Sequence, residues 1–184
     1  GAAEYEQLWQ ELTQSEPVVE HRSLPVWGRS LQVPKSTSHV ARFTFVQLCG
    51  EPRSAADYIA LCRKFHAIFI DDIPHMNLDM RDWARRFITF VDAAYESKAR
   101  LFCTSEVDIM KVFSNTTTWD EMSSSQMRVL MDDLNLDMSD IGSSSIFSGQ
   151  EELFAFARLL SRLSEMQTKA YAEMSAQLYH LNAS

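Results

Sequence analysis

The apolar residues in the first part of the chain change from helical spacing to strand spacing. Within residues 1–16 they recur every three or four positions, which predicts a leading amphipathic helix. These positions are Tyr5, Leu8, Trp9 and Leu12. The runs 23–26 and 30–34 then flank a glycine-bearing turn, a pattern that predicts a β-hairpin.

A third run, residues 40–45, alternates between apolar and polar positions with period two. It predicts a strand that extends the hairpin into a small antiparallel β-meander, with Arg42 and Thr44 facing solvent. A short helix is predicted next, because Ser54 suits the N-cap and Asp57 occupies the acidic position of a capping box.

The middle of the chain has the order strand, helix, strand. The apolar runs 67–70 and 100–103 predict two buried strands, and residues 78–97 between them predict a strong amphipathic helix. A connection of this length implies a right-handed parallel crossover, so part of the sheet should be parallel. The predicted fold class is therefore α/β: the meander is followed by a parallel strand–helix–strand unit.

The last third of the chain contains a polar segment and then a helical one. Residues 114–148 are rich in serine and threonine and predict an insert that is partly disordered, with a short helix over 127–134. Residues 149–180 predict one long C-terminal helix packed back on the sheet. We interpret residues 1–184 as a single α/β domain. Because the sequence begins without methionine, we expect it to be a piece of a longer chain.

Composition narrows the classes of function. A net charge of −8 and a pI near 5.1 argue against a nucleic-acid-binding surface, which needs a basic face. No apolar run approaches the roughly 20 residues that span a bilayer. Cys49, Cys62 and Cys103 form no CxxC pair and predict reduced, buried thiols. The five histidines lack HxxH or HExxH spacing, so no metal site is expected.

Two adjacent carboxylates, Asp71 and Asp72, follow the first buried strand of the parallel unit. In a P-loop ATPase, acids at this position hold the magnesium shell and polarise the attacking water. A polar residue at the end of the neighbouring strand senses the γ-phosphate, and Thr104, Ser105 or Glu106 would be that residue here. The two strand ends should lie together, because consecutive parallel strands end at the same side of a sheet.

The sequence also argues against this chemistry. The phosphate-binding motif GxxxxGK(S/T) is absent, since none of the five glycines is followed by lysine. The alternative is that Asp71, Asp72 and Pro74 form a turn that ends the strand, and without a phosphate loop this interpretation is favoured. A hydrolase based on Ser105 is the weakest hypothesis, because no glycine elbow or evident His/Asp set accompanies it.

Four arginines are further candidates. Arg85 and Arg86 lie in the middle of a predicted helix, where one of them can reach a phosphate or pair with an aspartate of the same helix. Spacing alone favours the internal pair. Arg158 and Arg162 are four residues apart on the last helix. They form either a surface ion-pair ladder or a contact with a partner or a phosphate, and both interpretations stay open.

Four ordered blocks of the sequence together resemble one protein family. They are residues 40–49 with 56–61 and 64–66, residues 85–92 (RRFITFVD), residues 130–134 (LMDDL) and residues 161–171 (SRLSEMQTKAY). In this order and spacing they resemble the C-terminal half of the ATPase-family-gene-one proteins. These are mitochondrial AAA-type ATPases that include the lactation-elevated protein 1 family and are related to bacterial ZapE. The resemblance covers residues 24–171.

The resemblance implies a P-loop ATPase that uses ATP and Mg²⁺ in mitochondrial protein quality control, in the matrix or at the inner membrane. It also implies that the phosphate loop, the catalytic acids and the arginine finger lie upstream of this chain, which by itself should not hydrolyse ATP. One of Arg85, Arg86, Arg158 and Arg162 would then act as a second nucleotide sensor or contact a neighbouring subunit.

The partners expected from the resemblance are the upstream ATPase domain, mitochondrial substrate proteins and further copies in a homo-oligomer. An alternative function is that of a non-catalytic interaction or assembly module. Such a module would dock substrate proteins or neighbouring subunits, using the acidic surface and the last helix.

Overall fold

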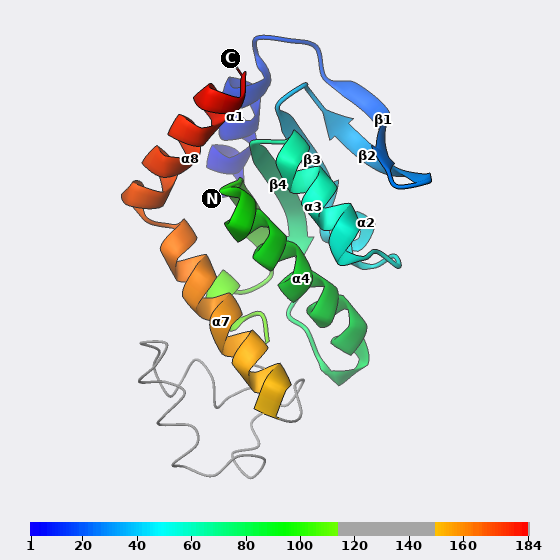
Figure 1. Cartoon of the computed structure of the whole chain (residues 1–184). Coiled ribbons are helices and arrows are strands. Elements are labelled where there is room, and N and C mark those ends of the chain that lie inside the picture. Colours follow the sequence, from blue (N-terminus) through cyan, green and yellow to red (C-terminus); the bar gives the residue numbers. More distant parts are fainter. Residues whose placement is uncertain (114–149, 184) are drawn as a thin grey trace.

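The computed structural model describes residues 1–113 and 150–183, which form one five-stranded sheet with helices on both faces (Figure 1). Across the sheet the strands follow chain order: β1 Val19–Val26, β2 Arg29–Ser36, β3 Val40–Thr44, β4 Ala67–Ile73 and β5 Arg100–Ser105. The helices are α1 Ala2–Thr13, α2 Phe45–Cys49, α3 Ala55–Lys64, α4 Arg81–Ser97, α7 Gln150–Met166 and α8 Lys169–Ala183, with short 3₁₀ turns η1 Leu78–Met80 and η2 Ile109–Lys111. The α/β class is confirmed.

The sheet has an antiparallel half and a parallel half. β1 pairs with β2 and β2 with β3 in antiparallel orientation, which confirms the predicted meander. β4 and β5 are parallel and joined by α4, which confirms the strand–helix–strand unit. β3 is also parallel to β4, with α2 and α3 in the connection, so the parallel part has three strands. The carboxyl ends of β3, β4 and β5 therefore lie at one end of the sheet and their amino ends at the other.

The strand predicted over 40–45 ends one residue early, at Thr44. Thr44 is the N-cap of α2: its hydroxyl accepts a hydrogen bond from the Gln47 N–H at 3.1 Å. The side-chain oxygen of Gln47 accepts in turn from the Thr44 N–H at 2.9 Å. This reciprocal capping box begins a helix at Phe45, although the alternating apolar pattern continues through that residue.

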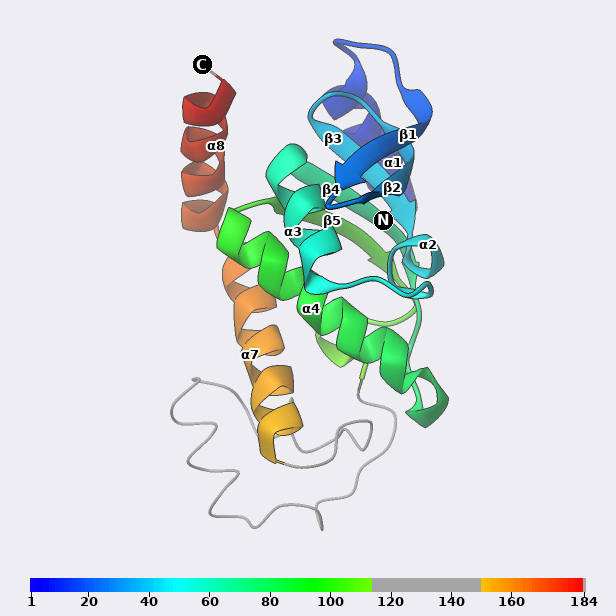
Figure 2. The same cartoon turned by 45° about the vertical axis from the view of Figure 1, so that its right-hand side comes forward.

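Alternate residues of the parallel strands point to two different helix layers. One face forms the main core under α2, α3, α4 and α7. The other face is covered by α1, whose Trp9 packs edge-on against Phe69 with 5.2 Å between ring centroids. Figures 1 and 2 show α1 on the side of the sheet opposite α3 and α4. Because both faces of β4 are covered, every residue from Ala67 to Ile70 is buried.

The C-terminal segment predicted as one helix over 149–180 is two helices, α7 and α8. The chain turns at Gln167 and Thr168, where the Thr168 hydroxyl accepts a hydrogen bond from the Tyr171 N–H at 3.2 Å and caps α8. The buried Tyr171 anchors α8 to the sheet, because its hydroxyl donates to the Ala99 carbonyl at 2.7 Å. The apolar spacing is nearly continuous across this turn, so the sequence pattern conceals it.

The predicted insert over 114–148, with its short helix over 127–134, lies outside the described residues. Within the described ranges, no helix is long and apolar enough to cross a membrane. The same ranges contain no group of three or more His, Cys, Asp or Glu side chains that could hold a metal ion. The three cysteines are free thiols, and Cys49 and Cys62 are buried as predicted, whereas Cys103 is partly exposed, so the prediction of burial is wrong for it.

Candidate functional site

The predicted acids lie at the carboxyl end of the parallel strands, and Asp71 is engaged there with other parts of the protein. Its carboxylate accepts a hydrogen bond from the Tyr5 hydroxyl at 2.5 Å and two from Arg42 Nε at 3.0 and 3.1 Å. Tyr5 belongs to α1 and Arg42 to the adjacent strand β3. Asp71 therefore joins α1, β3 and β4 at the end of the sheet.

Arg42 is the centre of this group. Its guanidinium lies over the rings of Tyr5 and Trp9, at 5.2 and 5.3 Å from their centroids, and donates to the Glu6 carboxylate at 3.0 Å. The side chain is only 12% exposed. The prediction that Arg42 faces solvent is therefore wrong, because α1 covers this face of the sheet. A buried guanidinium needs paired carboxylates, and Asp71 and Glu6 supply them.

The protonation states of the group follow from these contacts. Burial, together with the hydrogen bond to Asp71, raises the pKa of Tyr5 well above its usual value, so its hydroxyl remains a donor at neutral pH. The hydrogen bond from Arg42 lowers the pKa of Glu6. The Asp71 oxygens are thus occupied by an arginine and a tyrosine. A Mg²⁺ ion, which requires near-octahedral oxygen ligands and keeps several waters, would have to displace them.

Asp72 and the polar residues after β5 shape the backbone. Asp72 has a left-handed φ of 61°, and the pairing register between β4 and β5 shifts at this point. The Asp72 N–H donates to the Thr104 hydroxyl at 2.9 Å, and the Ser105 hydroxyl donates to a backbone carbonyl two residues on. Glu106 accepts a hydrogen bond from the His75 N–H at 3.0 Å. The candidate sensor groups therefore stabilise the bulged end of β4.

A cavity of about 310 Å³ opens beside this group. Strands β1 to β4 and helix α2 contribute its polar lining, which consists of Glu20, His21, Lys35, Arg42, Thr44, Asp71 and Gln47. Asp71 and Arg42 are paired with each other, and the remaining polar lining consists of a carboxylate, an imidazole, an ammonium, a hydroxyl and an amide, from Glu20, His21, Lys35, Thr44 and Gln47. This polar lining suits water or a small polar group.

Two of the candidate arginines join the C-terminal helix α7 to α4. Arg162 binds Asp92 at 2.6 Å and Glu96 at 3.2 Å, and its guanidinium lies 4.7 Å from the centroid of the Tyr95 ring. Arg158 reaches Asp92 at 3.2 Å. The partners are thus acids of the neighbouring helix α4. This pattern is an interhelical ion-pair network, which was not among the alternatives considered from spacing.

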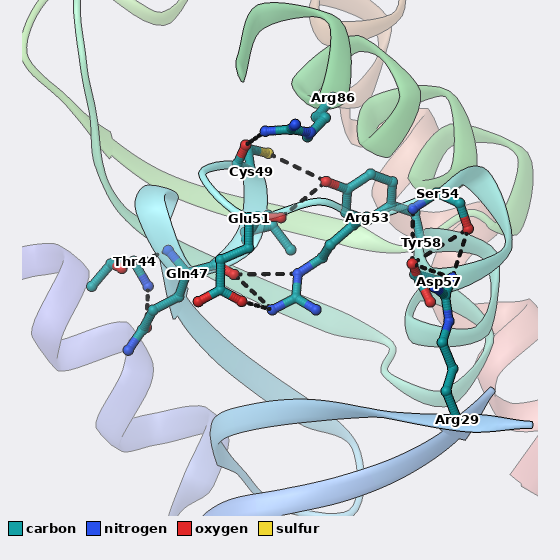
Figure 3. Close-up of polar contacts among 11 residues, drawn as sticks. Arg29, Thr44, Gln47, Cys49, Glu51, Arg53, Ser54, Asp57, Tyr58 and Arg86 are labelled. Carbon is teal, nitrogen blue, oxygen red and sulfur yellow. Dashed lines mark hydrogen bonds and ion pairs between the residues drawn. The ribbon is translucent and has the colours of Figure 1, made fainter. Parts of the chain in front are cut away.

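The other two arginines are also bound within the protein. Arg85 Nε donates to Glu152 of α7 at 2.9 Å, and its Nη1 lies 3.7 Å from Asp82 on its own helix. Arg86 donates to the Cys49 carbonyl at 3.1 Å (Figure 3). The four predicted candidates are therefore spread over two helices, Arg158 and Arg162 share Asp92, and none of the four lines the cavity beside Asp71.

The network around Arg86 fixes the loop between α2 and α3, as Figure 3 shows. The Tyr58 hydroxyl donates to the Leu48 carbonyl at 2.9 Å, and Arg53 donates to the Gln47 carbonyl at 2.9 Å. Burial raises the pKa of the Cys49 thiol to about 12, so it is not a reactive thiolate at neutral pH. These contacts hold the backbone of α2 against α3 and α4.

The predicted capping residue Asp57 begins α3 as expected. Its carboxylate accepts a hydrogen bond from the Ser54 N–H at 2.8 Å, which confirms the predicted contact between the acid of the capping box and the N-cap backbone. It also pairs with Arg29 of the hairpin at 2.7 Å, and the Asp57 side chain is 5% exposed. One carboxylate therefore caps α3 and ties it to the β1–β2 hairpin.

Sequence reasoning missed the partners of Asp71, which are Tyr5 and Arg42, and the second partner of Arg42, which is Glu6. A signal for Arg42 was present, because an arginine within a strand of apolar neighbours requires a counter-charge if both faces of the sheet are covered. The counter-charge could not be named, since Asp71 lies 29 positions away along the chain and Glu6 lies 36 positions away.

Fold and site together define an α/β domain with a three-stranded parallel core, whose strand-end acid belongs to an internal ion-pair network. The AFG1-like ATPase family matches this chain over residues 1–136, which is well over half of its length. The chain therefore belongs to the AFG1-like ATPase family, and the resemblance found in the sequence blocks is confirmed.

Three curated relatives are similar over most of the chain. An uncharacterized protein of Schizosaccharomyces pombe is 40% identical over 146 residues, which cover 79% of this chain and 31% of the relative. Lactation elevated protein 1 homolog B of Danio rerio is 32% identical over 165 residues, which cover 89% of this chain and 32% of the relative. Cell division protein ZapE of Escherichia coli is 31% identical over 175 residues, which cover 92% of this chain and 36% of the relative. The chain thus spans about a third of these relatives' lengths. No solved structure matches it.

Proposed function

We propose that this chain is the C-terminal α/β portion of an AAA-type ATPase whose whole protein binds and hydrolyses ATP with Mg²⁺. Membership of the AFG1-like ATPase family supports nucleotide hydrolysis by the whole protein. In this proposal the phosphate loop and the catalytic acids belong to the part outside this chain. The resemblance to the mitochondrial members further supports a role in mitochondrial protein quality control, in the matrix or at the inner membrane.

The proposal that the catalytic acids lie outside this chain rests on the contacts that Asp71 already makes. A catalytic acid must present free oxygen lone pairs to the metal shell or to the attacking water. The Asp71 carboxylate instead binds Tyr5 and Arg42 and secures α1 to the sheet. Its role is therefore structural, and hydrolysis depends on acids elsewhere in the whole protein.

The test compares stability with turnover in the full-length protein. The double variant Asp71→Asn with Asp72→Asn should unfold at a lower temperature yet retain its kcat at temperatures where it is folded. Asp72→Asn alone is the matched control and should change neither quantity. Complete loss of hydrolysis with unchanged stability would reverse the assignment, as would Mg²⁺-dependent ATP turnover by the purified 184-residue chain.

The proposed location has its own test. Cells that produce the tagged full-length protein are fractionated, and the protein is expected with the mitochondrial matrix or inner membrane. Depletion of the protein should raise the amounts of unassembled respiratory-complex subunits. A protein found outside mitochondria would contradict this part of the proposal and leave the ATPase assignment to the turnover measurements.

A second candidate function, that of an assembly module, is favoured by one exposed surface. Trp27, at the tip of the β1–β2 hairpin, is 94% exposed. A cavity of about 340 Å³ lies between Trp27 and α3, and one of about 790 Å³ lies between α3 and α4; Ile59 and Arg63 line both. Exposed apolar surface rimmed by polar groups is typical of interaction sites. Its proposed occupant is the remainder of the same protein, because the chain spans about a third of its relatives.

Hydroxyl-radical footprinting of the isolated chain and of the full-length protein tests this surface. Trp27 should be oxidised readily in the isolated chain and should be protected severalfold in the full-length protein. Val46, which is 52% exposed on α2, is the matched control and should react alike in both. Equal oxidation of Trp27 in the two proteins would eliminate the remainder of the protein as the occupant.

A further inference from the structure

Basic side chains surround a cavity of about 220 Å³ at the amino ends of the parallel strands, and we call this cavity the basal pocket. Arg63 and Lys64 come from the last turn of α3, and Lys98 directly follows α4. His39 and His66 directly precede β3 and β4. Three positively charged side chains and two imidazoles, from separate parts of the sequence, therefore line one cavity.

The basal pocket is basic within an acidic protein. None of the described residues that line it is acidic, although the whole chain has a net charge of −8. Two carboxylates of adjoining segments have other partners: Glu16 accepts from the Ser38 N–H at 3.1 Å, and Glu96 pairs with Arg162 at 3.2 Å. The like charges of Arg63, Lys64 and Lys98 repel one another across this cavity, and a bound anion would reduce that cost.

The backbone fixes part of the pocket in advance. The His66 N–H donates to the His39 carbonyl at 2.9 Å, which holds the two histidine segments together. Lys98 has a left-handed φ of 59°, uncommon for a residue other than glycine, and its ammonium lies 4.2 Å from the centroid of the Tyr95 ring. A preformed arrangement of this kind lowers the ordering cost of binding a ligand.

Hydroxyl groups complete the set of donors. Ser175 of α8 is 1% exposed and lines the pocket, with its Oγ 3.5 Å from His66 Nδ1. Ser97, the last residue of α4, lines the pocket as well. Charged nitrogen donors combined with hydroxyls are the groups that bind the oxygens of a phosphate.

Helix dipoles explain only part of this cluster. Cations near the C-terminal ends of α3 and α4 stabilise the carbonyl groups there. This effect accounts for Arg63, Lys64 and Lys98 one at a time, with no ligand required. It does not account for the convergence of the two histidines and Ser175 from other elements on the same cavity, or for a described lining without any acid.

We propose that the basal pocket binds a phosphate-type oxyanion, as inorganic phosphate or as the phosphate group of a small monoester. Sites for drug-sized ligands measure roughly 300–1,000 Å³. The smaller basal pocket therefore fits the anionic group rather than a whole nucleotide. The proposal is independent of the ATPase assignment, because the pocket and the candidate acids lie at opposite ends of the parallel strands.

Isothermal titration calorimetry of the 184-residue chain with inorganic phosphate, at an ionic strength held constant with sodium chloride, tests the proposal. Saturable binding is expected for the wild-type chain. The double variant Arg63→Gln with Lys64→Gln should bind at least about tenfold more weakly, because it removes two charge-assisted contacts. The matched control, Lys35→Gln with Lys169→Gln, removes the same charge outside the pocket and should change the affinity less than about twofold.

Thermal unfolding without phosphate checks that the variants are folded, and the exposed His39→Gln provides an independent pocket variant. Unchanged phosphate affinity in a folded pocket variant would overturn the proposal, as would the absence of saturable binding up to about 10 mM phosphate. Adenosine monophosphate distinguishes the sources of the anion. Tighter binding than phosphate identifies a monoester as the ligand, and equal or weaker binding identifies free phosphate.

Discussion

The two ends of the parallel strands β3, β4 and β5 use their charged residues in opposite ways. At the carboxyl end, Asp71 is held by Arg42 and Tyr5, and α1 covers the group. At the amino end, cations such as Arg63 and Lys64 border a cavity whose described lining contains no acid. Charges at the first end form ion pairs within the protein, whereas Arg63, Lys64 and Lys98 at the second end line a cavity together. The residues that attract attention in the sequence are therefore not those that the fold leaves available for a ligand.

Helices produce this difference. At the carboxyl end, α1 packs Trp9 on Phe69 and brings the Tyr5 hydroxyl to Asp71, so the strand-end acid is screened from solvent. At the amino end, the C-termini of α3 and α4 converge, and their carbonyl groups favour nearby cations. Four experiments test this difference between the two ends of the strands.

The largest effect is expected from removing the anchor of α1. Trp9→Ala should lower the free energy of unfolding by about 3–5 kcal/mol, because the buried ring fills the contact with Phe69. Urea unfolding of the 184-residue chain, followed by circular dichroism, measures the change. Trp27→Ala is the matched control and should have an effect within about 0.5 kcal/mol, since that ring is exposed. Equal effects would mean that α1 does not seal the carboxyl end.

The next largest effect is expected at Asp71. Removing one partner of a fully buried ion pair costs about 3–5 kcal/mol, and Asp71 is 23% exposed, so Asp71→Asn should cost about 2 kcal/mol. Asp72→Asn should be nearly neutral, because asparagine tolerates the left-handed backbone at this position. The same unfolding experiment measures both. Phosphate binding at the basal pocket should stay unchanged in both variants, and a parallel loss there would show that the two ends are coupled.

A smaller, pH-dependent effect is expected at Glu6. Its pKa is lowered in the folded protein by the hydrogen bond from Arg42. Its contribution to stability is therefore fully present above the ordinary carboxyl pKa of 4.5 and is lost as the pH falls through the lowered value. At neutral pH, Glu6→Gln should cost up to about 1 kcal/mol, as for a surface ion pair. Urea unfolding across a pH series should show the two proteins converging in acid, and a gap that stays constant would contradict this.

The smallest effect is expected from the thiols. Burial raises the pKa of Cys49 to about 12 and the pKa of Cys62 further still, so both are protonated near pH 8. Cys62 lines the basal pocket, whereas Cys49 lies in α2 beyond the carboxyl end of β3. A neutral alkylating reagent should label both far more slowly in the native chain than in urea, as mass spectrometry measures. Fast labelling of Cys62 alone would mean that the basal pocket opens into the core.

Much of the fold could be predicted from local patterns. Helical spacing identified α1 and α4, and two short runs around a glycine-bearing turn identified the β1–β2 hairpin, because each pattern depends on residues close together in the sequence. The errors also have local causes. The capping function of Thr44 was concealed by an apolar alternation that continues into Phe45. The break at Thr168 was concealed by helical spacing on both of its sides.

The candidate site was less predictable. Asp71 and Thr104 were correctly placed at neighbouring strand ends, since parallel pairing brings such ends together. Their partners could not be predicted, because Arg42 and Tyr5 reach Asp71 only after α1 packs across the sheet. The Arg158 and Arg162 contacts with Asp92 likewise depend on how α7 packs on α4.

The sequence by itself determined the α/β class, the meander, the parallel crossover and membership of the family, because these depend on periodicity and ordered motifs. Only the tertiary structure decided which charges are paired and which surround an open cavity. The physical reason is that the free energy of a charged side chain depends on its partners and on its exposure to water. Asp71 pairs with an arginine 29 positions away, and Lys64 and Lys98 line one cavity at the amino ends of the parallel strands. A local sequence pattern cannot predict either arrangement.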